Sequence, residues 1–279
     1  RDLLFGYVGA FMYEGDSPLA ERRAAALAVD PALLSELLGK VEMRELLDPE
    51  VIARFEREAQ KLAPDRRVRG VEGVADLLRI LGPLDAREVA ERLETTDDDA
   101  SATESTAAGL LGDLVDARRA IRVTIAGAAR VAAIEDAGRL RDGLGAALPV
   151  GIPNAFLEPL PDPLGDLVAR YARTHGPFTA DALAERLGVG VAVARHTLQR
   201  LEGQGRVSSG FFLPAGTSRD GVGGREETEW CDSEVLRRLR MRSLAAIRGS
   251  VEPVPPEAFA RFLPVWQHIN RPLEGIDGL

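Results

Sequence analysis

The residues able to carry enzyme chemistry are few and lie far apart in this sequence of 279 residues. The three histidines, His175, His196 and His268, stand apart from one another and from carboxylates at any motif spacing, so each is interpreted as structural or surface-exposed. The single cysteine, Cys231, follows Trp230 and fits a small packing residue. One cysteine excludes a disulfide within the chain and a cysteine-based zinc site. We therefore expect no catalytic residue and no metal site.

A phosphate-binding loop is also missing from the sequence. The only Gly-Lys pair, Gly39-Lys40, is followed by Val41 and lacks the preceding glycine that such a loop needs. The acidic run Asp97–Asp99 offers hard oxygens to a divalent cation. It lies in the Thr/Ser-rich stretch 95–104, which predicts a solvated loop instead. We expect this chain to hold no cofactor.

Residue types suited to nucleic-acid contact gather in and after the predicted helix Val191–Glu202, which begins after the turn Gly188–Gly190. Such a helix can enter the major groove when polar side chains reach base edges and basic ones hold the backbone. Five side chains here have suitable groups: Arg195, His196, Gln199, Arg200 and Arg206.

A second predicted helix, residues 234–248, is strongly basic. Five arginines oppose Glu234 on this helix: Arg237, Arg238, Arg240, Arg242 and Arg248. They cannot all share one face, so positive charge covers more than half of the helix surface. Guanidinium forks match phosphate oxygens, but the chain also has 44 acidic residues against 35 basic ones for a net charge of −9. Phosphate contact and pairing with acidic protein surfaces both remain open.

The elements that carry these residues form a repeated pattern. Aromatic residues make up 5% of the chain, which disfavours a sheet-rich fold. Three helices followed by a hairpin occur twice, at a spacing of roughly 90 residues. In the first copy we predict helices that run from Val71 to Gly82, from Asp85 to Leu93 and from Ala107 to Ala117, then a hairpin around Gly127. In the second copy we predict helices over 164–174, 179–187 and 191–202, then paired strands over 206–209 and 211–213. The predicted fold is mainly α with small β wings, in which a helical segment precedes tandem winged-helix modules.

The predicted organisation has four parts: a helical segment 1–66, winged-helix modules 70–152 and 155–232, and two helices in 233–279 that open a further module. In the first part, Ser17-Pro18, Asp30-Pro31 and Asp48-Pro49 each pair a capping side chain with a proline at the first helical position. The sequence has no initiator Met, and it stops within ordinary-looking residues. We therefore expect a fragment of a longer protein.

Several segments resemble the large helicase-related (Lhr) family. The stretch "LLFGYVGAFMYEGDSPLAERRAAAL" (Leu3–Leu27) closely resembles the end of the DEAD/H-associated domain in that family. Four later segments are similar to the sequence that follows it in long actinobacterial members: "LLGKVEMRELLDPEVI", "GVEGVADLLRILGPL", "GPFTADALAERLGV" and "EWCDSEVLRRLRMRSLAAIRGSVEPVPPEAFARFLPVWQ". The resemblance covers nearly the whole chain.

This resemblance implies a non-catalytic piece of an ATP-dependent 3′-to-5′ DNA helicase associated with DNA repair. In the family, the motor domains, which use ATP and Mg²⁺, lie upstream, and a C-terminal string of winged-helix modules assembles the protein into oligomers. The motor is absent here, so no motor residue can be assigned. The implied partners are the upstream motor domains of the same chain, further copies of the protein, and DNA bound weakly without sequence preference. We expect a cytoplasmic protein, since nothing in the sequence spans a membrane and the single cysteine suits a reducing compartment.

Two alternatives come from other functional classes. A stand-alone winged-helix regulator would read DNA with helix Val191–Glu202, but no dimerisation domain with a ligand pocket is apparent. Winged-helix DNA glycosylases are a second, weaker resemblance, and their Gln-x-Gln or Gln-x-Asp motif does not occur at any of the four glutamines: Gln60, Gln199, Gln204 and Gln267.

Because Asp181, Glu185 and Glu202 lie near the helix and no lysine follows Lys61, we predict that Val191–Glu202 is a scaffold helix.

Overall fold

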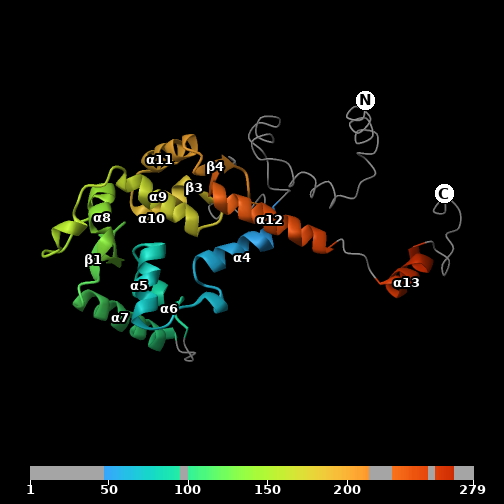
Figure 1. The fold of residues 1–279 in the computed structure, drawn as a ribbon, viewed down its shortest axis with the longest axis horizontal. Helices are drawn as coiled ribbons and strands as arrows, with labels where there is room; N and C mark the ends of the chain where they lie inside the picture. Colours follow the sequence, from blue (N-terminus) through green and yellow to red (C-terminus); the bar gives the residue numbers. More distant parts are fainter. Residues whose placement is uncertain (1–46, 95–99, 214–227, 251–254, 267–279) are drawn as a thin grey trace.

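The computed structural model describes residues 47–94, 100–213, 228–250 and 255–266 (Figure 1). The described chain is mainly helical with small antiparallel sheets, which confirms the predicted fold class. The Leu3–Leu27 segment, the run Asp97–Asp99 and His268 lie outside the described residues. The four-part division of the chain stays a prediction.

The first helix–hairpin unit contains α5 (Gly70–Leu81), α6 (Ala86–Ala90), α7 (Ala100–Asp116), β1 (Ala120–Ile125) and β2 (Ala128–Ala133). Strands β1 and β2 are antiparallel. Leu84 exchanges two backbone hydrogen bonds with Val131, so a single residue pairs with β2 as a third strand would. Ala126 and Gly127 both have positive φ, as a two-residue hairpin turn requires, so the predicted hairpin around Gly127 is confirmed. We call this unit module 1.

Two helix boundaries in module 1 differ from the sequence prediction. The second helix, expected to run to Leu93, ends at Ala90. The chain then turns so that the Val68 amide donates to the Arg92 carbonyl and the Glu94 amide donates to the Val68 carbonyl. The third helix was expected from Ala107 but already begins at Ala100. Part of the stretch predicted as a loop over 95–104 is therefore helical.

The second unit, module 2, contains α9 (Pro163–Thr174), β3 (Phe178–Thr179), α10 (Ala180–Leu187), α11 (Val191–Gly203), β4 (Val207–Gly210) and β5 (Glu229–Asp232). The predicted caps are confirmed: the Thr179 hydroxyl accepts from the Ala182 amide, and Gly188 ends α10 in the left-handed conformation. The spacing of Val191, Ala194, Leu198 and Leu201 predicts the inward stripe of α11. The last three are fully buried, and Val191 packs partly buried against the same core.

The wing of module 2 differs from its prediction. Strand β4 was expected to pair with residues 211–213 but pairs with β5, which follows residues 214–227 in the sequence. The order of strands in this sheet is β3-β5-β4. The reason is Glu229, which is almost fully buried and accepts the backbone N–H groups of Phe212 and Leu213, both at 2.7 Å. These two amides are therefore satisfied by a side chain rather than by a strand ladder.

The two modules pack directly against each other. The short 3-10 helix Ile134–Asp136 leads into α8 (Ala137–Leu144), and the chain then passes through a second 3-10 helix, Asn154–Phe156, to α9. The outer face of the module 1 hairpin shares one core with α8 and with Leu167 of α9. The turn after α10 touches the hairpin tip, because a Cβ added at Gly188 would lie 2.9 Å from the Ala126 amide nitrogen.

Two segments far apart in sequence complete the molecule. Helix α4 (Pro49–Ala59) is capped by Asp48 and leads through the 3-10 helix Pro64–Arg66 to module 1. It lies beside the long helix α12 (Ser233–Ser250), and Figure 1 shows α13 (Pro256–Trp266) beyond the end of α12. The Asp232 side chain caps α12 as expected. Within the described ranges, no helix combines the length and apolar character needed to cross a bilayer.

The contact between α4, α12 and the wing of module 2 leads to a stability prediction. Leu239 of α12 is fully buried in a core that includes Phe55 of α4 and Phe212 beside the wing. We expect Leu239→Ala to lower the free energy of unfolding by about 2–5 kcal/mol, because it removes buried methyl groups and leaves a cavity. Met241→Ala on the same helix is the control: 60% of Met241 is exposed, so the change should stay within about 0.5 kcal/mol. If urea unfolding showed that both substitutions lower the free energy of unfolding equally, a core shared by α4, α12 and the wing would be contradicted.

Candidate nucleic-acid interface and module junction

The outward face of α11 presents three of the predicted contact residues. Arg195, His196 and Gln199 are exposed, and their side chains have no hydrogen-bond or ion-pair partner within the described ranges. They share the face with Val193, which is 48% exposed. Because the opposite side of α11 is buried in the core of module 2, this face is held rigidly toward solvent.

Arg200 lies in the last turn of α11 and Arg206 follows the helix, and the two differ in whether a carboxylate pairs with them. The Arg200 guanidinium makes two hydrogen bonds to the Asp162 carboxylate, at 2.6 and 2.8 Å. Hydrogen bonding from Arg200 is the main cause that lowers the pKa of Asp162, and the charge of Arg206 adds to it. The Arg206 side chain is exposed and has no ion-pair partner in the described part of the chain. Of these two arginines, Arg206 is the one whose charge is available to a ligand.

The four candidate arginines of α12 are divided between ion pairs and burial. Arg237 and Arg238 both bond to Glu234, which lowers the pKa of that carboxyl to about 2. Arg242 donates to Glu58 of α4 at 2.7 Å and lies 5.8 Å from the centre of the Phe55 ring. Arg240 is only 6% exposed, so this side chain does not belong to the outer surface of α12. Helical spacing alone did not predict this burial, because it does not show which side of α12 packs against the rest of the protein.

The third helix of module 1 has the opposite charge to that of module 2. The charged side chains of α7 are Glu104, Asp113 and Asp116, and all three are exposed. A helix whose outer face holds only carboxylates repels a phosphate backbone. The equivalent helices of the two modules therefore differ: α11 presents basic and amide groups, whereas α7 presents acids.

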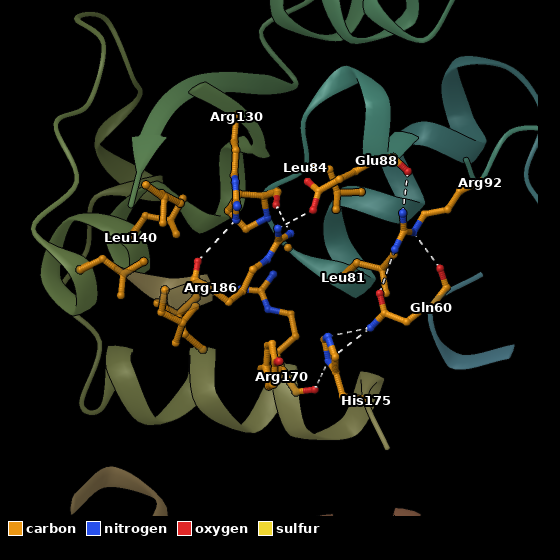
Figure 2. Close-up of a pocket in the computed structure, with 17 residues that line it drawn as sticks. Gln60, Leu81, Leu84, Glu88, Arg92, Arg130, Leu140, Arg170, His175 and Arg186 are labelled. Atoms are coloured by element: carbon orange, nitrogen blue, oxygen red, sulfur yellow. Dashed lines mark hydrogen bonds and ion pairs between the residues drawn. The ribbon is translucent and has the colours of Figure 1, made fainter. Parts of the chain in front are cut away.

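Charged side chains meet in the junction between the two modules (Figure 2). Arg186 of α10 forms an ion pair with Glu88 of α6 and donates a second hydrogen bond to the Pro83 carbonyl at 2.9 Å. Glu88 also completes the capping box of α6 with Asp85. Arg130 of β2 reaches the Arg186 carbonyl at 3.4 Å. Glu88, the carboxylate that caps α6 in module 1, thereby binds Arg186 of module 2.

The second half of the junction is centred on Gln60, directly after α4. Arg92 donates to the Gln60 backbone carbonyl at 2.8 Å and to its side-chain oxygen at 2.9 Å, while the Gln60 amide nitrogen donates to the Thr174 carbonyl at 2.7 Å. That nitrogen also contacts the ring of His175, which stacks on Tyr171 with ring centres 3.7 Å apart. Gln60 and Arg92 are both buried.

These groups line a cavity of about 160 Å³ between the modules. Sequence reasoning missed the junction, because Gln60, Glu88, Arg92 and Arg186 lie on four separate elements and match no motif. The only available signal was the capping-box spacing of Asp85 and Glu88.

Among the described residues, no three His, Cys, Asp or Glu side chains converge as a metal site requires. His175 is part of the junction, whereas His196 lies on the α11 surface.

Comparison with known proteins identifies the family. Residues 45–159 match the family model described as the winged-helix domain of large helicase-related protein. The chain is 54% identical over 278 residues to a Mycolicibacterium smegmatis protein named Lhr helicase/probable uracil glycosylase. It is 42% identical over 261 residues to an Escherichia coli protein named Lhr helicase/uracil glycosylase. The chain belongs to the Lhr family.

These Lhr relatives are much longer than the chain. The alignments cover 99% and 94% of the chain, but only 17% and 16% of the length of the mycobacterial and E. coli proteins. The chain therefore corresponds to about one sixth of each Lhr relative. The resemblance of its sequence to the Lhr family is confirmed over nearly its full length.

The junction leads to a prediction on pH. Burial lowers the pKa of His175 from 6.5 to about 4, so the folded chain keeps this ring neutral. The unfolded chain binds the proton more readily between these values, so stability should fall as pH drops from 6.5 toward 4, by on the order of 3 kcal/mol.

Replacing His175 by Gln removes that titration. Glu56, whose pKa is raised by burial, acts in the opposite direction in both proteins, so the difference between them isolates His175. We expect urea unfolding to show a shallower acid loss for His175→Gln than for the wild type. If the free energy of unfolding fell equally with pH in both proteins, His175 would not be buried and neutral in the folded chain.

Proposed function

We propose that the chain is a non-catalytic winged-helix segment of an Lhr-type ATP-dependent DNA helicase. In this proposal it is a scaffold that contacts DNA weakly and without sequence preference. Its partners are the motor domains of the same protein, which bind ATP and Mg²⁺, and further copies of the protein in an oligomer. Family membership and the helicase names of two relatives support the proposal.

The observation that carries the proposal is the charge on the two third helices. A pair of reader modules would present basic and polar side chains from both helices. Here α7 exposes Glu104, Asp113 and Asp116, and α11 exposes Arg195, His196 and Gln199 with no lysine near them. Counterion release supplies most non-specific affinity, so a surface with few cations binds weakly.

The scaffold role is supported by the way in which the modules are joined. Charged groups from α6 and α10 satisfy each other in the junction, and the hairpin of module 1 shares a core with α8 and α9. In α12, Arg240 is buried and Arg242 bonds to Glu58, so this basic helix uses part of its charge within the protein. We assign α12 to protein contact rather than to DNA.

Titration of the purified chain with labelled duplex DNA tests the proposal directly. By fluorescence anisotropy at about 0.1 M salt we expect dissociation constants weaker than about 1 µM, and equal for unrelated sequences, because few phosphates are neutralised. Sub-micromolar affinity that is lost in Arg195→Ala/Gln199→Ala would instead show that α11 reads DNA. That result would favour the stand-alone regulator.

Catalysis assays test the remaining alternative, which the relatives' names suggest. Both relatives have uracil glycosylase in their names, whereas this chain has no Gln-x-Gln or Gln-x-Asp motif. We expect the chain to release no uracil from uracil-containing DNA and to hydrolyse no ATP. Uracil release that co-purifies with the chain at constant specific activity would overturn the non-catalytic assignment.

A further inference from the structure

A second cleft, distinct from the cavity in the module junction, is lined by five arginines from both modules and the connection between them. They are Arg79 of α5, Arg139 of α8, Arg170 and Arg173 of α9, and Arg206 after α11. Three acids also line it: Glu135, Asp136 and Asp166. The cleft has a volume of about 400 Å³. Its lining has two more positive than negative charges, in a chain whose net charge is −9.

The acids of the cleft are already engaged with part of this charge. The buried Asp136 carboxylate binds Arg139 at 2.5 Å and Arg170 at 2.5 and 2.9 Å. Arg79 pairs with Asp76 at 3.0 Å and lies 3.5 Å from Glu135. These pairs hold the floor of the cleft in place, because a buried carboxylate between two guanidinium groups has little freedom to move.

Two cationic groups of the cleft remain available to a ligand. Arg173 and Arg206 are exposed and have no ion-pair partner in the described part of the chain. The Arg139 Nε atom is buried without a hydrogen-bond partner, although Asp166 lies 3.5 Å away. A buried N–H that donates to no acceptor is destabilising unless something else accepts its hydrogen bond.

We propose that this cleft binds the phosphodiester backbone of a nucleic acid strand, with Arg173 and Arg206 as its phosphate contacts. Arginine forks match phosphate oxygens and contact them whatever the base sequence. Arg206 lies close enough to Asp162 to lower its pKa, and Asp162 binds Arg200 of α11, so the cleft borders the α11 surface. The nucleic acid strand crosses from module 2 onto α8. This inference rests on the proposed function and gives its weak DNA contact a location.

The test compares two double variants that remove the same charge. Arg173→Ala/Arg206→Ala removes the two available arginines of the cleft, and Arg54→Ala/Arg67→Ala removes two exposed arginines that do not line it. Binding of a labelled single strand and of its duplex is followed by anisotropy between about 50 and 200 mM salt. The cleft variant should bind about tenfold more weakly, and its log–log salt slope should be smaller by about 1.4 units for the single strand and 1.8 for the duplex.

The control variant should match the wild type in both affinity and slope. Arg173→Lys/Arg206→Lys keeps the charges and should restore the slope. Thermal unfolding of all variants should be unchanged, because the altered side chains are exposed. Equal slopes for cleft and control variants, with the wild type still binding DNA, would overturn the cleft and leave the proposed function standing.

Two other results would also overturn the cleft. Equal slopes together with a change in oligomer mass for the cleft variant would assign the arginines to an acidic surface of another copy. Absence of any wild-type binding at about 50 mM salt would overturn both the cleft and the DNA contact of the proposed function.

Discussion

The structure depends on the requirement that polar groups enclosed between the two modules find partners. An ion or amide taken out of water is destabilising unless another group replaces the lost hydrogen bonds. Arg186 and Glu88, on different modules, satisfy this requirement for each other, and Gln60 does so for Arg92 and for the Thr174 carbonyl. Because these bonds are directional, they favour one orientation of the modules over others that would bury a similar apolar area.

That orientation determines which surfaces face solvent. It seats the turn at Gly188 against the hairpin tip at Ala126 and leaves the outer face of α11 exposed. It also brings Arg79 of module 1 and Arg173 of module 2 into one cleft. The acids on α7 belong to the module without an exposed basic helix. The difference in charge between the two modules supports the scaffold role that we propose for this chain.

Much of the fold could be predicted from the sequence because local signals determine it. Asp48-Pro49, Thr179 and Gly188 mark helix ends through their own backbone and side-chain bonding, so their roles do not depend on distant residues. The tandem repeat was visible because each module shows its own helical periodicity. The wing of module 2 was predicted wrongly since Glu229, 17 positions from Phe212, takes the amides that a local strand would have used.

The candidate site was less predictable than the fold. Arg195, His196 and Gln199 were found because exposure on a helix follows from its buried stripe. The pairing of Arg242 with Glu58 depends on α4, which lies far away in sequence, and the burial of Arg240 does not follow from the spacing of residues along α12. Gln60 gave no signal, since an isolated glutamine has no motif, and its role comes only from the carbonyl and guanidinium groups around it. Long-range polar partners are the part that sequence patterns do not encode.

The polar contacts of the junction hold the two modules as one rigid body. Spin labels at Ser105→Cys on α7 and Ala192→Cys on α11 test it, because both positions are exposed while the native Cys231 is fully buried. Pulsed electron spin resonance should give one narrow distance distribution, which broadens when Glu88→Ala and Gln60→Ala remove the junction contacts. A broad distribution in the otherwise unaltered chain, unchanged by those two substitutions, would contradict the account.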